Sequence, residues 1–200
     1  MGKIFCIIGK SSTGKDTIYQ RLLEEKELGL RRIVTYTTRP VRKNEKHGVE
    51  YFFCGREEKE RFLAQGKVIE MRSYDTCHGV WDYFTVADEQ MNLAEESYLL
   101  IGTLASYCKI RDFYGAEKVV PIYIEVEDGQ RLERALRREQ KQAAPKYAEM
   151  CRRFLSDEQD FSEEKLDAAG IEKRFVNEGD IEEVLTDIAA YIREEDRAEK

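Results

Sequence analysis

The most constraining feature of this chain is an apolar run that leads through a glycine-rich loop into a helix. Residues 4–8 read Ile-Phe-Cys-Ile-Ile, which is typical of a parallel strand buried on both faces. Residues 9–15 read Gly-Lys-Ser-Ser-Thr-Gly-Lys, and a helix-like pattern begins directly afterwards. This order predicts an α/β fold in which the loop lies at the carboxyl edge of a parallel sheet, where ligands bind.

The loop has the composition of a phosphate-binding loop. Gly9 and Gly14 allow the backbone to turn tightly and to approach a ligand with several N–H groups pointing inward. Lys15 adds a positive charge opposite the β- and γ-phosphates, and the helix N-terminus adds a partial positive charge there. A turn without a ligand is the alternative, but the joint occurrence of strand, spacing, lysine and helix favours the nucleotide site.

The residue after the lysine departs from the usual pattern, which has Ser or Thr there to hold magnesium. This chain has Asp16, followed by Thr17. An aspartate oxygen suits Mg²⁺, directly or through water, so these two residues are the candidate metal ligands. Alternatively, Asp16 only stabilises the first helical turn, by about 0.3–1 kcal/mol, and both roles are compatible.

Length and composition fit one domain that acts on a small anion. The chain has 200 residues, 42% of them hydrophobic, which is enough for one good core. The net charge of −7 argues against nucleic-acid binding, no apolar stretch is long enough to cross a membrane, and five scattered cysteines indicate reduced thiols in the cytoplasm. Residues 31–46 and 131–153 are nevertheless rich in Lys and Arg, which suits a nucleotide, although a solvated helix face is the alternative for 131–153.

The remaining periodicity predicts buried strands that alternate with helices. We expect strands over 32–37, 51–53, 67–72, 83–86, 98–101, 119–126 and 173–176. We expect helices over 57–65, 104–114, 130–142, 146–159 and 181–192. Such alternation predicts a parallel doubly wound sheet.

A second phosphate site is predicted after the first basic segment. Arg39 and Arg42 follow threonine hydroxyls and precede Tyr51, and guanidinium forks with phenol and hydroxyl groups form a grip for a dianionic phosphate. The chain here resembles the guanylate kinase family, through the phosphate-binding loop, Thr-Thr-Arg-Pro-Val-Arg at 37–42 and Gly-Val-Glu-Tyr-Phe-Phe at 48–53. The resemblance in element order covers nearly the whole chain.

The resemblance implies a three-layer P-loop kinase fold with a parallel doubly wound sheet, a small mixed insert that binds the nucleoside monophosphate, and a helical lid. The core would comprise residues 1–34, 87–137 and 160–200, the insert 35–86 and the lid 138–159. The implied reaction is the magnesium-dependent conversion of GMP and ATP to GDP and ADP.

The resemblance also assigns site residues. Catalysis would involve Lys15, Arg134, Arg138 and Arg153. ATP would contact Gly9, Ser11, Ser12, Thr13, Gly14, Lys15, Asp16, Thr17 and Asn177. GMP would contact Thr35, Arg39, Arg42, Tyr51, Glu70, His78, Tyr83 and Thr103. Glu70 would accept hydrogen bonds from guanine N1 and N2, the alternative being a solvated glutamate at a strand edge.

Two departures from the family pattern concern the acceptor side. Where the family has Tyr-Gly-Thr or Tyr-Gly-Ser, this chain has His78-Gly79-Val80, and Tyr83-Phe84-Thr85 follows. Either His78 replaces the tyrosine, or an insertion moves the role to Tyr83 and Thr85. Thr103 stands where the family has an aspartate, and we hypothesise that Asp16 compensates for this missing carboxylate. Drift toward inactivity is the alternative.

Three functions remain open from the sequence. A nucleoside monophosphate kinase for GMP comes first. A P-loop kinase for another small phosphorylated acceptor, such as a different nucleotide or a sugar phosphate, comes second. The third is a catalytically silent guanylate-kinase-like module that binds a protein, against which the intact Gly9, Gly14 and Lys15 argue.

Overall fold

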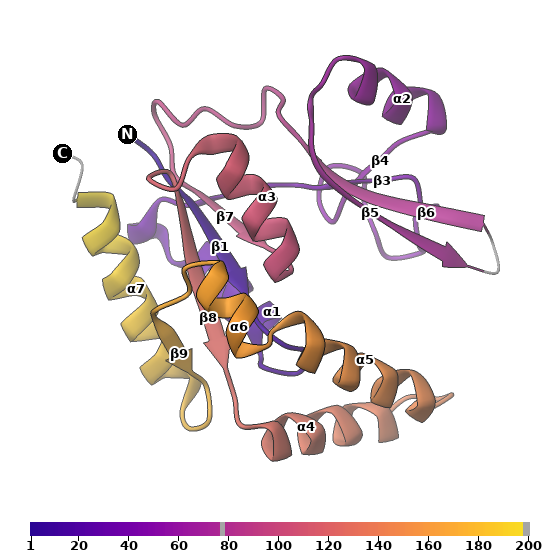
Figure 1. Cartoon of the computed structure of the whole chain (residues 1–200), viewed down its shortest axis with the longest axis vertical. Coiled ribbons are helices and arrows are strands. Elements are labelled where there is room, and N and C mark those ends of the chain that lie inside the picture. The colour runs from indigo at the N-terminus through magenta and orange to yellow at the C-terminus, as the bar shows by residue number, and fades with distance from the viewer. Residues whose placement is uncertain (77–78, 198–200) are drawn as a thin grey trace.

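A five-stranded parallel sheet forms the centre of the computed structural model, which describes residues 1–76 and 79–197 (Figure 1). Its strand order is β2-β7-β1-β8-β9, so β1 lies in the middle. The strands are β1 (Ile4–Ile8), β2 (Arg31–Arg32), β7 (Tyr98–Ile101), β8 (Val119–Glu125) and β9 (Arg174–Val176). The helices of this part are α1 (Lys15–Glu24), α3 (Leu104–Tyr114), α6 (Glu163–Ala168) and α7 (Ile181–Arg197), with a short 3₁₀ helix at Lys26–Leu28. The predicted parallel doubly wound sheet is confirmed.

Two hydrophobic clusters hold helices against opposite faces of this sheet. Phe5 and Ile7 pack in a cluster with α1 and α7, whereas Ile4, Cys6 and Ile8 pack in a cluster with α3 and α6. Every residue of β1 is buried, as the apolar run predicted. Burying one such side chain contributes about 1.5–3 kcal/mol, so the first strand is fixed firmly in the sheet. The loop that follows it therefore begins from a rigid element.

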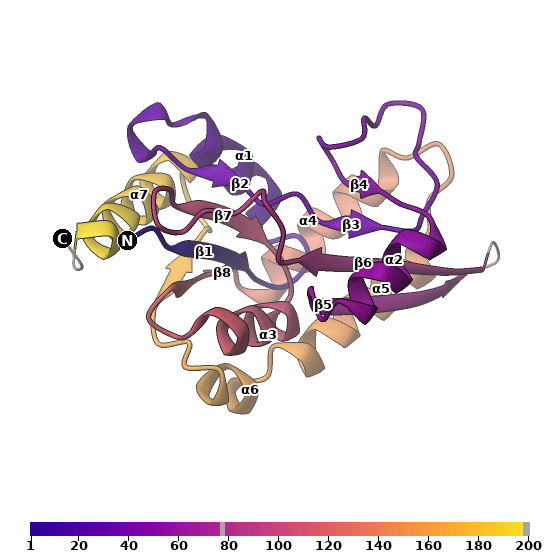
Figure 2. The same ribbon diagram turned by 90° about the horizontal axis from the view of Figure 1, so that it is seen from above.

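A smaller mixed sheet lies beside the main one (Figure 2). Its strand order is β4-β3-β6-β5, with β3 and β4 parallel and the other pairs antiparallel. Its elements are β3 (Tyr36–Thr37), β4 (Phe52–Phe53), β5 (Val68–Thr76) and β6 (Gly79–Val86), together with α2 (Arg56–Ala64). All of them fall within the segment 35–86 that the sequence assigns to the insert.

The single strand predicted over 32–37 is wrong. Arg31 and Arg32 pair with β7 of the main sheet, whereas Tyr36 and Thr37 pair with β4 and β6 of the smaller sheet. Ile33 and Val34 between them are buried. The segment is therefore apolar in its middle, as a buried strand would be, but within it the backbone leaves the main sheet and enters the smaller one.

A hairpin of two helices extends from the carboxyl end of β8 (Figure 1). It consists of α4 (Asp128–Gln140) and α5 (Tyr147–Asp160), which contact one another. The sequence predicted both helices but not α6, and α7 continues beyond the predicted end at 192.

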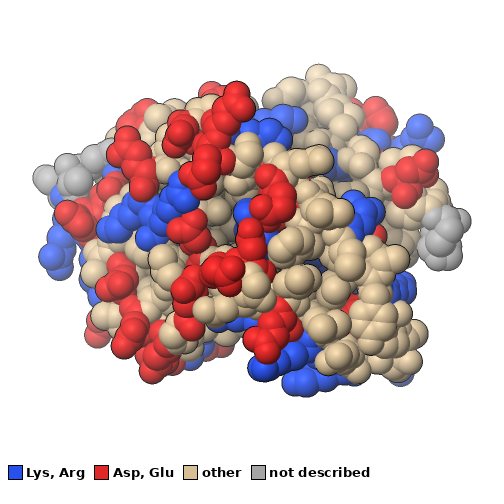
Figure 3. Space-filling view, turned by 60° about the horizontal axis from the view of Figure 1, so that its bottom comes forward, with Lys and Arg blue, Asp and Glu red and all other residues tan. Residues whose placement is uncertain are grey.

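On the face shown in Figure 3, acidic and basic side chains are interspersed. In the described part of the chain, no helix has the length and apolar character needed to cross a membrane.

Candidate functional site

The loop between β1 and α1 has a backbone that requires glycine at two positions. Gly9 and Gly14 have φ angles of 155° and 86°. A Cβ atom at Gly9 would lie 2.5 Å from the carbonyl oxygen of Ile124, and one at Gly14 would lie 2.6 Å from the side-chain nitrogen of Asn177. Such distances are not tolerated, so the spacing of the two glycines is a packing requirement as well as a conformational one.

Side-chain hydrogen bonds to backbone carbonyl oxygens stabilise the conformation of this loop. The Asn177 side-chain amide donates to the carbonyl oxygen of Thr13 at 2.8 Å, and the Thr13 hydroxyl donates to that of Lys10 at 3.0 Å. The Arg134 guanidinium donates to the carbonyl oxygen of Asn177 at 2.9 Å. In this conformation Asn177 and Arg134 therefore support the loop, and their predicted contacts with ATP stay predictions.

Two polar groups of the loop are suited to receive an anion. The Ser12 hydroxyl is buried and, in the part of the chain that is described, has no hydrogen-bond partner, although an orphaned buried hydroxyl is costly. Burial lowers the pKa of Lys15, the carboxylates of Asp16 and Asp157 oppose that shift, and the charges of Arg153 and Arg138 reinforce it. Lys15 and the two lid arginines predicted from the sequence are thus close enough to interact, and a polyphosphate among them would be stabilised by all three charges.

A carboxylate of the α4–α5 hairpin binds this loop. Asp157 accepts a hydrogen bond from the Ser11 backbone N–H at 2.7 Å. Arg131, whose side chain is 1% exposed, donates to the Ser11 carbonyl oxygen at 3.2 Å and pairs with Glu158 at 2.7 Å. Its guanidinium also lies 4.5 Å from the ring centre of Phe154. Sequence reasoning missed Arg131 and Asp157. Arg131 is one of several basic residues in the segment 131–153, and Asp157 lies beyond that segment among other acidic residues, so no local signal marks either of them.

Asp157→Asn should tighten ATP binding by about fivefold, which corresponds to about 1 kcal/mol. The carboxylate occupies a loop N–H that a phosphate needs, and it adds a negative charge beside the nucleotide. Isothermal titration calorimetry with a non-hydrolysable ATP analogue measures the change. The control is Asp167→Asn, at an exposed position of α6. Unchanged or weaker binding by Asp157→Asn alone would mean that this carboxylate does not compete with phosphate.

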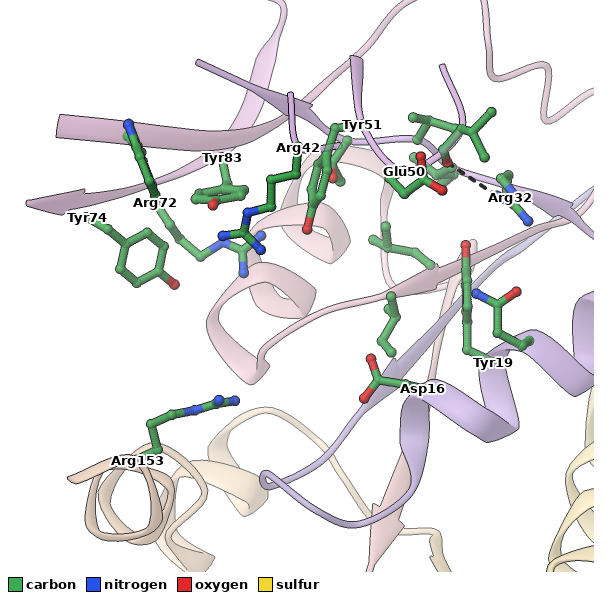
Figure 4. A pocket seen from close by; sticks show the side chains of 18 of the residues that line it. Asp16, Tyr19, Arg32, Arg42, Glu50, Tyr51, Arg72, Tyr74, Tyr83 and Arg153 are labelled. Carbon is green, nitrogen blue, oxygen red and sulfur yellow. Dashed lines mark hydrogen bonds between the residues drawn. The ribbon is translucent and has the colours of Figure 1, made fainter. Parts of the chain in front are cut away.

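A cavity of about 1150 Å³ separates the loop from the smaller sheet (Figure 4). Asp16 and Arg153 line it on the side of the phosphate-binding loop and lid, and Arg42, Tyr51 and Tyr83 line it on the side of the insert. Of the sequence-predicted acceptor residues, Thr35 also lines it. Its volume is large enough for a nucleotide, and it extends from Asp16, directly after the phosphate-binding loop, to the predicted acceptor residues Arg42 and Tyr51, although residues 9–15 themselves do not line it.

The two predicted arginines of the insert differ in their surroundings. Arg39 is 3% exposed, its two terminal nitrogens donate to Glu45 at 2.8 and 2.7 Å, and its Nε donates to the Tyr83 hydroxyl at 3.1 Å. It also stacks 5.3 Å from the ring centre of Tyr51. Arg42 is exposed and lines the cavity. Arg39 thus organises the tyrosines, and Arg42 presents its charge to the cavity.

The β5–β6 ladder bears on the two alternatives for the role of His78. Glu70 lies opposite Thr85, and their side chains form a hydrogen bond of 2.9 Å between the Thr85 hydroxyl and Glu70 Oε1. Tyr83 lies two residues before Thr85 and contacts Arg39, as described above. These contacts favour the alternative in which Tyr83 and Thr85 take the roles of the family's tyrosine and hydroxyl residue. His78 lies outside the described residues.

Two further predicted residues, Thr103 and Thr17, do not line the large cavity. The Thr103 side chain caps α3, with its hydroxyl accepting from the Ser106 N–H at 3.2 Å, and it lines a smaller neighbouring cavity of about 450 Å³. Thr17 is exposed and is not among the residues that line the large cavity, whereas Asp16 is. Of the two candidate metal ligands, Asp16 is therefore the one near the acceptor.

Together, a central parallel strand that ends in a phosphate-binding loop, a smaller mixed sheet, a helical hairpin that carries arginines and an arginine-lined cavity between them define a P-loop phosphotransferase. The family model for guanylate kinase matches residues 1–195, and the chain belongs to this family. The resemblance seen in the sequence is thereby confirmed.

Individual relatives agree with this family. A guanylate kinase from Neisseria gonorrhoeae (strain ATCC 700825 / FA 1090) is 41% identical over 101 residues, 50% of this chain and 46% of that protein. One from Malacoplasma penetrans (strain HF-2) is 29% identical over 126 residues, 62% of each. The matches thus span about half the length of the Neisseria relative. The crystal structure of guanylate kinase from Anaplasma phagocytophilum superposes with a TM-score of 0.67 at 26% identity, over 97% of this chain and 86% of that one.

Proposed function

We propose that this chain transfers the γ-phosphoryl group of ATP to GMP, giving ADP and GDP, and that it does so in the cytoplasm. The observation that carries the proposal is the cavity that joins Arg153 and Asp16 on one side to Arg42 and Tyr51 on the other. A donor phosphate in the loop and an acceptor phosphate in the insert would face one another across it. Phosphoryl transfer needs chiefly such positioning and neutralisation of charge.

Different residues act on the phosphate donor and on the acceptor. The N–H groups of the loop and Lys15 bind the β- and γ-phosphates, and Arg138 and Arg153 neutralise the charge on the transferring group. On the acceptor side, Arg42 and Tyr51 bind the GMP phosphate so that one of its oxygens can attack in line. No covalent intermediate with the protein is required.

The residues present fit a magnesium ion with a single protein carboxylate. Asp16 is exposed at the cavity wall, and the described part of the chain contains no group of three or more His, Cys, Asp or Glu side chains that could hold a metal. Mg²⁺ is commonly bound by one or two carboxylates, substrate phosphates and water, so Asp16 suffices. When bound, the ion would neutralise charge on the phosphate oxygens.

Asp16→Ala should raise the Mg²⁺ concentration for half-maximal activity by about tenfold, the loss expected when a group that orients a metal is removed. Combining Asp16→Ser with Thr103→Asp should recover more activity than the two single changes predict, because the residues would share one ion. Aspartate is also a good N-cap, so α3 should start normally. The control is Glu24→Ala, which removes an exposed carboxylate from the same helix. Strict additivity, or an unchanged magnesium requirement in Asp16→Ala, would reduce Asp16 to a helix-start residue.

Arg42→Ala should raise KM for GMP by about 10- to 100-fold, because charge-assisted contacts contribute about 1.5–3 kcal/mol, and should leave KM for ATP nearly unchanged. Steady-state kinetics with each substrate varied in turn measures both constants. Lys43→Ala, at the adjacent exposed position, is the control. Equal increases in both constants would contradict the separation of the two phosphate sites.

The acceptor is tested by thermal shift and turnover with GMP, dGMP, AMP, CMP and UMP, each with ATP and Mg²⁺. A ligand at 100 times its Kd stabilises a protein by about 2.7 kcal/mol, which is readily measured. We expect GMP to be the preferred acceptor. Turnover of another nucleotide or of a sugar phosphate would support the second kinase, and binding without turnover would support the silent module.

A further inference from the structure

Arg72 lies between the part of the acceptor site that is expected to bind the guanine base and the part that is expected to bind the phosphate. It is two residues after Glu70 on β5, so both side chains lie on the same face of the smaller sheet. In the β5–β6 ladder Arg72 lies opposite Tyr83, and Glu70 lies opposite Thr85. The Glu70–Thr85 pair, expected at the guanine base, and the Arg72–Tyr83 pair, expected at the phosphate, are therefore neighbours on one face of the sheet.

Among the described residues, the guanidinium of Arg72 has a hydrogen-bond partner at Nε alone. Its Nε donates to Glu70 Oε2 at 3.2 Å, while the other Glu70 oxygen accepts from Thr85. The Glu70 side chain is 2% exposed and the Arg72 side chain 30%. The terminal nitrogens of Arg72 have no hydrogen-bond partner among the described residues, so they remain available to a ligand in the cavity that Arg72 lines.

The acceptor site needs another cation of this kind. A nucleotide's terminal phosphate carries a charge of about −1.5 to −2 at pH 7. Both terminal nitrogens of Arg39 are already bound to Glu45 at 2.8 and 2.7 Å. Arg42 is exposed and has no ion pair among the described residues. Arg72, whose ion pair with Glu70 is made through Nε, adds two further donor nitrogens.

The position of Arg72 also places it near the phosphate-side tyrosines. Figure 4 shows the side chains of Arg42 and Arg72 extending into the cavity beside Tyr83. Burial and the neighbouring Tyr83 raise the pKa of Tyr51, and the charges of Arg39 and Arg72 oppose that shift. The charge of Arg72 thus acts where the phosphate would bind, although its Nε is bound on the base side.

We propose that Arg72 is a further phosphate-binding arginine of the acceptor site beside Arg42, whose terminal nitrogens donate to the acceptor's phosphate while its Nε holds Glu70 at the base. This inference rests on the proposed function in assuming a nucleoside monophosphate as acceptor. It also connects base and phosphate through one side chain, because the bond that orients Arg72 is made to the residue expected to bind guanine.

Arg72→Gln is a sharp test, since the glutamine side-chain nitrogen can occupy the position of Arg Nε and still donate to Glu70, whereas the terminal guanidinium nitrogens are lost. Calorimetry compares GMP with guanosine, which lacks the phosphate. We expect Kd for GMP to rise about 10- to 100-fold, the effect of losing charge-assisted bonds, and Kd for guanosine to stay within about twofold. The control is Arg61→Gln, an exposed arginine of α2 paired with Glu58.

Two outcomes would overturn the inference. If GMP and guanosine weaken equally, Arg72 only orients Glu70, and if GMP affinity is unchanged, Arg72 does not contact the phosphate. Circular dichroism checks that the variant is folded. Should the unaltered protein prefer AMP to GMP, the guanylate assignment fails, but the comparison of AMP with adenosine in Arg72→Gln still tests the phosphate contact.

Discussion

Lys15→Ala should lower kcat by about 10³-fold or more while the protein remains folded. The lysine amine lies at the start of α1, in the loop expected to hold the transferring phosphoryl group, and its charge interacts with those of Arg138 and Arg153. Removing one preorganised charge or donor at such a point typically costs about 10²–10³-fold, and a residue that bridges phosphates through the transition state costs more. Single-turnover measurement of GDP formation tests this directly.

The same lysine contributes little to the fold. Its one hydrogen bond within the described structure is donated to the Lys10 carbonyl oxygen at 3.3 Å, and its charge is disfavoured by burial. We therefore expect the melting temperature of Lys15→Ala to equal or exceed that of the unaltered chain in the absence of ligand. Lys26→Ala, at an exposed position, controls for the loss of a surface charge. Near-normal turnover by Lys15→Ala would refute the assignment of this loop.

Local patterns predicted the part of the fold that surrounds β1. The apolar run 4–8 and the spacing of Gly9 and Gly14 are short-range signals, and each depends on backbone conformation that the residues themselves dictate. The division of 32–37 between two sheets could not be predicted in this way. It is decided by which partner strands accept Arg32 and Tyr36, and those partners lie at 99 and at 52 and 84 in the sequence.

The contacts within the candidate site are even harder to predict from local sequence patterns. The bond between Ser11 and Asp157 joins residues that are 146 positions apart, and the one between Ser11 and Arg131 spans 120. No spacing rule predicts such contacts. Arg72 is different, because alternation along a strand places it on the same face as Glu70, and attention to that period would have identified it from the sequence.

Glu70 is the residue through which base selectivity should be controlled. Its carboxylate is buried, yet its two partners, the Thr85 hydroxyl and Arg72 Nε, leave lone pairs on both oxygens. Guanine presents two adjacent N–H donors on N1 and N2, and adenine presents an acceptor at N1. A buried carboxylate therefore matches guanine and leaves adenine with an unpaired polar contact, which is a strong basis for discrimination.

Glu70→Gln should lower kcat/KM for GMP by about 10²-fold or more, and kcat/KM for AMP, which we expect to be low in the unaltered protein, should stay nearly unchanged. The amide keeps the shape of the carboxylate but replaces one acceptor by a donor, so one guanine N–H meets another N–H, and an unmatched buried polar group costs about 1–3 kcal/mol at each end. IMP, which lacks the N2 amine, should lose less than GMP, and that difference separates recognition of the base from damage to the site. Glu57→Gln, an exposed glutamate of α2, is the control. If the unaltered protein uses GMP and AMP equally well, Glu70 does not recognise guanine, and the guanylate assignment fails while a P-loop kinase remains.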